Sequence, residues 1–172
     1  GLAAVLMPGV LRRSAQGAIT SGGLQVLAFA DRRGSRPEQT AKFDWVRQSI
    51  QFAQDDKEEV RAFPEQRPLT DRLSFLWLYA FAGEPSPGRE LRPALVDGRG
   101  FAGFRYQVQR PETWNSPAGP LRVVRLVKQV DPGDDRTTEV WLAADRGYIP
   151  VRVLVAEKDG SRTDQMITGM SR

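Results

Sequence analysis

Short runs of alternating apolar and polar residues, separated by turn-forming pairs, dominate the sequence. The segment FRYQVQR, residues 104–110, places two aromatic residues and a valine on one face and polar residues on the other, as a half-buried strand requires. Ser21-Gly22-Gly23 and Asp159-Gly160 are typical of hairpin turns. Since strands and long helical segments do not alternate in the βαβ manner, we expect an antiparallel sheet.

One segment, Thr70–Ala82, instead predicts a helix. Thr70 is a good N-cap, Asp71 lies where the helix dipole favours an acid, and Gly83 is a typical end. Apolar residues cover most of the circumference, which predicts burial on more than one side. We therefore expect a mainly β protein, an antiparallel curved sheet or half-open barrel with one buried α-helix, forming a single domain over residues 1–172.

The N-terminal thirteen residues are apolar first and basic afterwards. A secretory signal has the opposite order, so none is predicted, although a trimmed exported chain would look the same. No apolar run reaches the roughly 18 residues that a membrane-spanning helix needs. We expect no transmembrane segment.

The chain contains no Cys and no His. This excludes Ser-His-Asp and Cys-His nucleophiles, the usual zinc sites and haem with His ligation. The acidic turn DPGDD, residues 131–135, offers fewer oxygen ligands than calcium loops provide. We therefore expect no catalytic residues, cofactor or metal. A carboxylate-based hydrolase is the enzymatic alternative, but the spacing singles out no carboxylate pair.

The formal net charge is +4 and the isoelectric point about 9.8, values that could suggest nucleic-acid binding. Acidic residues nevertheless lie among the basic ones throughout, as in DRRGSRPE and EKDGSRTD. Mixed signs lower the local potential on which binding to a phosphate backbone depends. We expect no nucleic-acid partner.

Three arginines, Arg32, Arg33 and Arg36, lie close together after an apolar run. Guanidinium groups at this spacing could hold a lipid phosphate or a glycan carboxylate in a bidentate manner. The alternative, which we favour, is a strand that ends in a polar loop, with Asp31 and Glu38 as local partners.

Aromatic residues recur in the predicted strands and helix. They could form the wall of a site for a lipid or another apolar ligand. A filled core needs the same residue types, and we favour that interpretation. The candidate ligand-binding residues are Trp45, Phe75, Trp77, Phe104, Tyr106 and Trp141.

Several motifs resemble the bacterial domain-of-unknown-function family 3108: GLQVLAFADRRGSRPEQTAKFDW, DRLSFLW, PAGPLRVVRLVKQVDPGDDRTTEVWLAADRGYIPVRVLV and EKDG. The resemblance covers about Leu11 to Ile167. It implies an exported or periplasmic protein without an established activity. Since family members usually carry further strands before the first motif, we expect a trimmed N-terminus and a first strand that lacks a partner.

A shorter segment, TTEVWLAADRGYIPVRV, also resembles the last strands of lipoprotein carriers of the LolA and LolB type. Those carriers are half-open barrels that hold acyl chains. The predicted buried helix, the aromatic strands and the two resemblances together suggest a non-catalytic protein of the cell envelope, which binds a lipid-like or amphipathic ligand in a curved β-sheet cavity covered by the Thr70–Ala82 helix. The alternative is an assembly module that binds an envelope protein through an exposed β-edge.

Overall fold

A computed structural model describes residues 10–131 and 133–169 of the protein. The prediction of a trimmed N-terminus concerns residues 1–9, which lie outside the described part. The chain divides into two compact units. The N-terminal unit comprises the described residues up to Phe75 together with Ala94–Gly103. The C-terminal unit comprises Leu76–Pro93 and the described residues from Phe104 onward. The single domain expected from the sequence stays a prediction.

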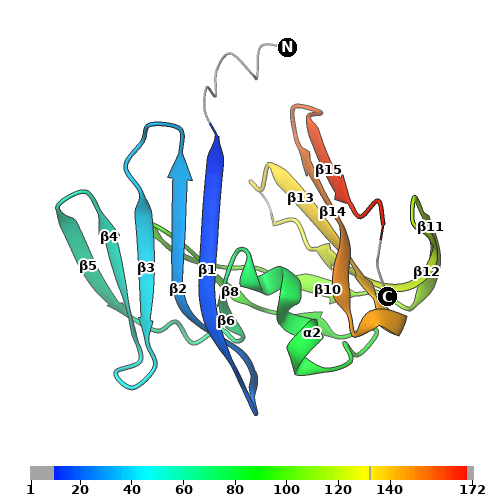
Figure 1. The fold of residues 1–172 in the computed structure, drawn as a ribbon, viewed down its shortest axis with the longest axis horizontal. Coiled ribbons are helices and arrows are strands. Elements are labelled where there is room, and N and C mark those ends of the chain that lie inside the picture. The colour runs from blue at the N-terminus through cyan, green and yellow to red at the C-terminus, as the bar shows by residue number, and fades with distance from the viewer. Residues whose placement is uncertain (1–9, 132, 170–172) are drawn as a thin grey trace. The chain divides into compact units, whose positions relative to one another are not determined.

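A five-stranded antiparallel sheet forms most of the N-terminal unit, and its strands follow one another in chain order (Figure 1). They are β1 (Leu11–Thr20), β2 (Gly23–Arg33), β3 (Gln39–Asp44), β4 (Ser49–Gln54) and β5 (Lys57–Ala62). The turn between β1 and β2 falls at the predicted Ser21-Gly22. One face of this sheet is apolar, as the alternation predicts: Val26, Phe29, Ala41 and Ile50 are fully buried.

A second, three-stranded sheet completes this unit, in the order β6 (Leu69–Asp71), β8 (Ala94–Asp97), β9 (Gly100–Gly103). The first pair is parallel and the second antiparallel. The parallel pair was not predicted. Leu69, Ala94 and Val96 from this sheet pack into the same core as the five-stranded sheet.

The predicted helix Thr70–Ala82 is wrong in its extent. Its first two residues belong to strand β6, and a 3₁₀ turn, η1 (Ser74–Trp77), precedes the short helix α2 (Leu78–Ala82). The strand forms because backbone pairing with β8 outweighs the local helical pattern. Only Leu78 of α2 is buried, so the predicted burial of the helix on more than one side is wrong.

The capping role predicted for Thr70 belongs to Asp71. One carboxylate oxygen, Oδ1, accepts hydrogen bonds from the backbone amides of Leu73 at 2.7 Å and Ser74 at 2.9 Å. Asp71 itself is completely buried. Its side chain therefore fixes the point where β6 ends and η1 begins.

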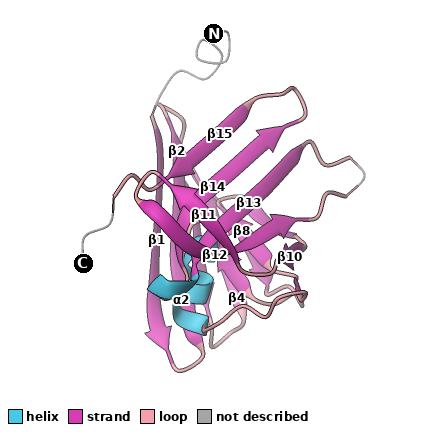
Figure 2. Cartoon of the chain, turned by 90° about the vertical axis from the view of Figure 1, so that its right-hand side faces the viewer, coloured by secondary structure: helices cyan, strands magenta, loops and turns pink. Residues whose placement is uncertain are grey.

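A seven-stranded antiparallel sheet forms the C-terminal unit (Figure 2). Its spatial order is β15-β14-β13-β12-β10-β7, and β11 also pairs with β12. The bounds are β7 (Glu90–Leu91), β10 (Tyr106–Val108), β11 (Glu112–Ser116), β12 (Gly119–Lys128), β13 (Arg136–Ala143), β14 (Ile149–Glu157) and β15 (Arg162–Met166). A 3₁₀ turn, η2 (Ala144–Arg146), joins β13 to β14.

These elements confirm the predicted fold class. The protein is mainly β, its sheets are antiparallel except for one pair, and one short α-helix is present among the described residues. The sheets do not close into a barrel in the described part of the chain. Within those same residues, no helix has the length and apolar character needed to cross a membrane.

Candidate functional site

An apolar groove of about 240 Å³ lies in the C-terminal unit. Leu76 and Trp77 of η1 form one wall, and the rest comes from Pro150–Val153 of β14 and from Gln165–Ile167 at the end of β15. Two large apolar side chains in the lining are exposed: Trp77 by 45% and Met166 by 39%. Exposed apolar side chains gathered at a groove are typical of a binding surface.

A β-bulge shapes the β14 side of this groove. Trp141 of β13 lies opposite Arg152, whereas the next residue, Leu142, lies opposite Pro150, so that Val151 is the extra residue. Pro150 fits there because a bulge does not require its missing amide. Beyond β15, the backbone amide of Ile167 donates to the Val151 carbonyl at 3.0 Å. Because Val151 is an extra residue in β14, the consecutive residues Pro150–Val153 all line the groove.

Arg152, the one charged side chain among the described residues of the groove lining, already has partners. Its Nε and Nη2 donate to the two carboxylate oxygens of Asp164 at 2.9 and 2.6 Å. The guanidinium also lies 4.5 Å from the ring centre of Trp141 and 5.7 Å from that of Trp114. These hydrogen bonds lower the pKa of Asp164 below its usual range and raise that of Arg152. Because the charge is neutralised, the groove favours an apolar occupant over an anion.

The ring of Trp141 packs against two arginines on the neighbouring strands. Its cross-strand neighbours are Arg125 on β12 and Arg152 on β14, and both guanidiniums lie over its ring. Arg125 also forms ion pairs with Glu139 at 3.0 Å and Glu112 at 3.7 Å. Trp141 is only 5% exposed. It therefore acts in this structure as a packed platform for two arginines.

Two of the six predicted aromatic residues belong to the N-terminal unit. Trp45 packs against Phe63 with ring centres 4.9 Å apart, and its indole Nε1 donates to the Val26 carbonyl at 2.6 Å. Phe75 is buried. Both residues have the packing expected of a filled core.

The other four, Trp77, Phe104, Tyr106 and Trp141, belong to the C-terminal unit. Tyr106 and Trp141 are buried, and the Lys128 ammonium lies 5.1 Å from the ring centre of Phe104. Trp77 lines the apolar groove. The remaining groove residues were not predicted. They come from the bulged part of β14 and from the end of β15, which are distant from Trp77 in the sequence.

The structure separates the three predicted arginines. Strand β2 ends at Arg33, and the Arg36 amide donates to the Arg33 carbonyl at 3.0 Å, which confirms the predicted strand end. Arg33 and Arg36 line a hollow of about 30 Å³, whereas Arg32 lines a different one. The predicted local partner was wrong for Asp31, because its carboxylate pairs with Arg13 at 3.2 Å across the hairpin.

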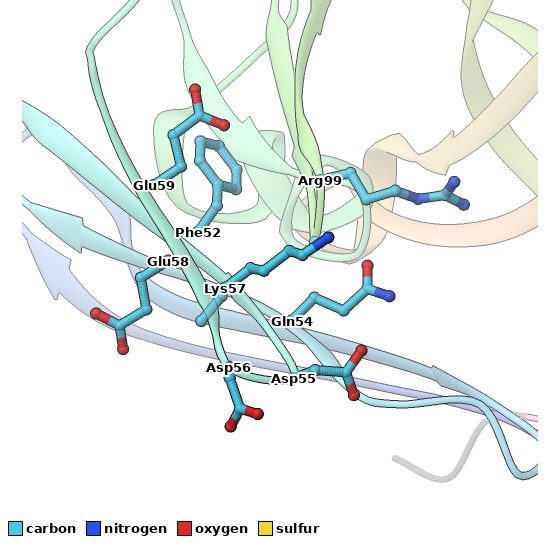
Figure 3. A pocket seen from close by; sticks show the side chains of 10 residues that line it. Phe52, Gln54, Asp55, Asp56, Lys57, Glu58, Glu59 and Arg99 are labelled. Atoms are coloured by element: carbon cyan, nitrogen blue, oxygen red, sulfur yellow. The ribbon is translucent and has the colours of Figure 1, made fainter.

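A larger, charged pocket of about 660 Å³ lies between the β4–β5 hairpin and the turn that joins β8 to β9. Gly98 of that turn contacts β3 so closely that a Cβ would lie 2.3 Å from the Gln39 Cβ. Lys57 extends toward the turn that carries Arg99, whereas Asp56 and Glu58 point the other way (Figure 3). The pocket thus combines both signs of charge around a turn fixed by close packing.

One carboxylate of this pocket, Glu59, does not have the environment of a general acid. Glu59 accepts two hydrogen bonds of 2.6 Å from Arg61, which lower its pKa. Glu58 accepts a hydrogen bond of 2.9 Å from Gln51. A catalytic acid requires the opposite, a raised pKa. The shift at Glu59 is therefore opposite to that of a catalytic acid, and the carboxylate-hydrolase alternative stays untested.

The aspartates of the acidic turn all have basic partners. Each of its three carboxylates lies within ion-pair distance of a basic residue: Asp131 of Arg105, Asp134 of Lys128 and Asp135 of Lys158. Among the described residues, no cluster of three or more potential metal ligands is present.

A model of a family described as "Protein of unknown function (DUF3108)" matches residues 3–167. The chain belongs to the DUF3108 family. The resemblance seen in its motifs is therefore confirmed over nearly the whole length. No curated protein and no solved structure matches this DUF3108 chain. The resemblance to LolA- and LolB-type carriers stays a prediction.

Proposed function

We propose that this DUF3108 protein is a non-catalytic protein of the cell envelope that binds an apolar chain, such as the acyl part of a lipid-like molecule, in the groove beside Trp77. One observation carries the proposal: Trp77 and Met166 remain exposed in a groove where Arg152, the single charged residue among the described residues of the lining, is neutralised by Asp164. An acyl chain fits this chemistry because it needs apolar contact and no ionic partner.

The expected driving force is the burial of apolar surface, about 25 cal/mol per Å² removed from water. Trp77 offers a flat, rigid surface, and Met166 is flexible enough to adjust to chains of different shape. The groove is open, so the ligand is held along one side and not enclosed. The exported or periplasmic location rests on the family resemblance and is part of the proposal.

The test is a titration of the full-length protein with a fluorescent fatty-acid analogue, combined with native mass spectrometry of protein purified from membrane extracts. Met166→Arg places a charge in the groove at an exposed position of β15, so it should abolish binding while the protein stays folded. Val60→Arg is the matched control, because Val60 is 66% exposed on another edge strand, β5. Equal binding by both variants would refute the proposal.

A second candidate function is assembly through an exposed edge strand. Among the described residues, β1 pairs on one side only, it is ten residues long, and Ile19 on it is 69% exposed. A long unprotected edge is a template for a strand from another chain. The envelope partner would then add to β1.

The absence of cysteine allows a direct test of this alternative. A single Ser14→Cys substitution on β1 can carry a photocrosslinker, and Lys42→Cys on the central strand β3 is the control. A partner crosslinked through Ser14→Cys and not through Lys42→Cys supports the assembly role. Equal labelling from both positions argues against it.

A further inference from the structure

We propose that Arg12 and Arg32 form a binding site for a phosphate group. The two residues are direct cross-strand partners in the β1–β2 hairpin. Like charges directly opposite each other destabilise a sheet. An anion between the two guanidiniums removes that repulsion and gains charge-assisted hydrogen bonds from both.

A β-bulge produces this pairing. Near the turn, Gly17 lies opposite Val26; beyond the bulge, Gln16 lies opposite Ala28. Without the one-residue shift, Arg12 would lie opposite Asp31, an acid. With the shift, Arg13 lies opposite Asp31 and Arg12 lies opposite Arg32. Bulges often re-aim side chains at functional positions.

Gly17 makes the bulge sterically feasible. A Cβ on this residue would lie 2.7 Å from the backbone carbonyl oxygen of Gln25, closer than real Cβ atoms approach backbone. Strand β1 therefore needs glycine at the shift. The arrangement that brings Arg12 and Arg32 together is a specific feature of this hairpin and not a consequence of two arbitrary surface arginines.

The two side chains lie at a hollow of about 270 Å³. The described residues that line it are Val10, Arg12, Arg32 and Gly34, and they include no carboxylate. Within the described part of the chain, neither arginine forms an ion pair or a side-chain hydrogen bond. Gly34, with φ of 57°, donates its amide to the Val10 carbonyl at 3.0 Å, which fixes the end of the hairpin.

The chemistry favours a phosphate group. A guanidinium presents a planar fork of donors that matches phosphate oxygens, and two forks can engage one phosphate from different strands. The small hollow beside Arg33 is lined by Arg33, Arg36 and Arg99 and by one acid, Asp31, which pairs with Arg13, so its net charge adds to the positive potential. The phosphate could belong to a lipid headgroup or be free in solution. This site lies in the N-terminal unit and does not depend on the groove proposed above.

The test is the effect of inorganic phosphate on the thermal stability of the full-length protein, in buffers of equal ionic strength made up with sodium chloride. Phosphate should raise the Tm of the wild-type protein and leave the Tm of the double variant R12Q/R32Q unchanged. The control Arg47→Gln removes an exposed arginine of the same unit and should keep the wild-type response. Without phosphate, the double variant should be at least as stable as wild type, so loss of folding does not confuse the result.

Vesicles distinguish the two sources of phosphate. Co-sedimentation with phosphatidylglycerol vesicles, compared with phosphatidylcholine vesicles, measures binding to anionic headgroups. Binding to the anionic vesicles that is lost in R12Q/R32Q assigns the site to a lipid phosphate; a response to inorganic phosphate alone assigns it to a free phosphate. The proposal is overturned if neither probe acts on the wild type, or if R12Q/R32Q and Arg47→Gln respond alike. Met166→Arg should not change the Tm response to inorganic phosphate, which separates this site from the groove.

Discussion

Two pairs of arginines, one pair on each large sheet, differ in the partners of their guanidinium groups. On the seven-stranded sheet, Arg125 and Arg152 each have a carboxylate partner and share the ring of Trp141. On the five-stranded sheet, Arg12 and Arg32 face each other, and neither has an acidic partner among the described residues. The two pairs thus have different electrostatic environments: Arg125 and Arg152 lie on either side of Trp141, whereas Arg12 and Arg32 are directly opposite each other.

The difference separates arginines that hold the fold together from arginines available to a ligand. A guanidinium that already donates to a carboxylate and lies on an aromatic ring has little to gain from an external anion. A guanidinium opposite another one gains both hydrogen bonds and relief from repulsion. Exposure and sequence proximity do not distinguish the two kinds; register does.

The largest expected change in stability comes from Trp141, whose ring packs against Arg125 and Arg152. Trp141→Ala removes a buried ring from the core of the C-terminal unit and leaves two guanidiniums without their support. We expect the free energy of unfolding to fall by about 3–5 kcal/mol, measured by urea denaturation. Trp77→Ala is the matched control: its ring is exposed, so it should cost much less. Comparable losses from both would contradict the assigned packing.

The next effect tests the bulge that sets the register of Arg12. Gly17→Ala forces a Cβ against the Gln25 carbonyl, and we expect a loss of about 1–3 kcal/mol in unfolding free energy. Gly22→Ala is the control, since a Cβ there meets only the Thr20 hydroxyl at 3.7 Å. If Gly17→Ala proved neutral, the close approach, and with it the one-residue shift, would be in doubt.

Local signals in the sequence were sufficient for much of the fold. The Ser21-Gly22 turn and the alternation on either side predicted β1 and β2, since a hairpin depends on neighbouring residues. The charged segment Asp55–Glu59 has no alternation of apolar and polar residues, yet it forms a two-residue turn followed by the start of β5, because an edge strand can keep charged side chains in solvent.

The predictions that failed depend on contacts between distant residues. The helical spacing after Thr70 was real, but backbone pairing with Ala94 and Leu95 converts its beginning into strand. The position of Arg32 in a cationic cluster was predicted, whereas its true partner, Arg12, follows from a bulge that no local pattern indicates. Of the six predicted aromatic residues, Phe75, Tyr106 and Trp141 are buried, whereas Trp77 is exposed and lines the groove.

Removal of the Asp164 carboxylate should leave Arg152 without its ion-pair partner, as Arg12 and Arg32 are in the described part of the chain. Asp164→Asn breaks the bidentate pair with Arg152 and should cost up to about 1 kcal/mol at pH 7, as partly exposed ion pairs do. The pKa of Asp164 is lowered in the folded state, so its contribution is present above the unfolded pKa of about 4 and is lost as pH falls through the folded value. Urea denaturation should therefore show a wild-type advantage at pH 7 that shrinks below about pH 4. A difference that is constant with pH would contradict the ionic origin.

The smallest expected effect is the change in unfolding free energy when one cross-strand arginine is replaced by glutamate. This change should have opposite signs in the two sheets. Arg12→Glu places a carboxylate opposite Arg32 and should raise the unfolding free energy by about 0.2–1 kcal/mol. Arg136→Glu is the same substitution in the other sheet, where it replaces the 2.7 Å pair with Glu157 by two like charges, so it should lower stability by a similar amount. Since both effects are electrostatic and near the surface, 1 M salt should diminish them. Urea denaturation at low and high salt measures both. If the two variants changed stability in the same direction, the contrast between the sheets would not be electrostatic, and the case for an anion between Arg12 and Arg32 would lose its physical basis.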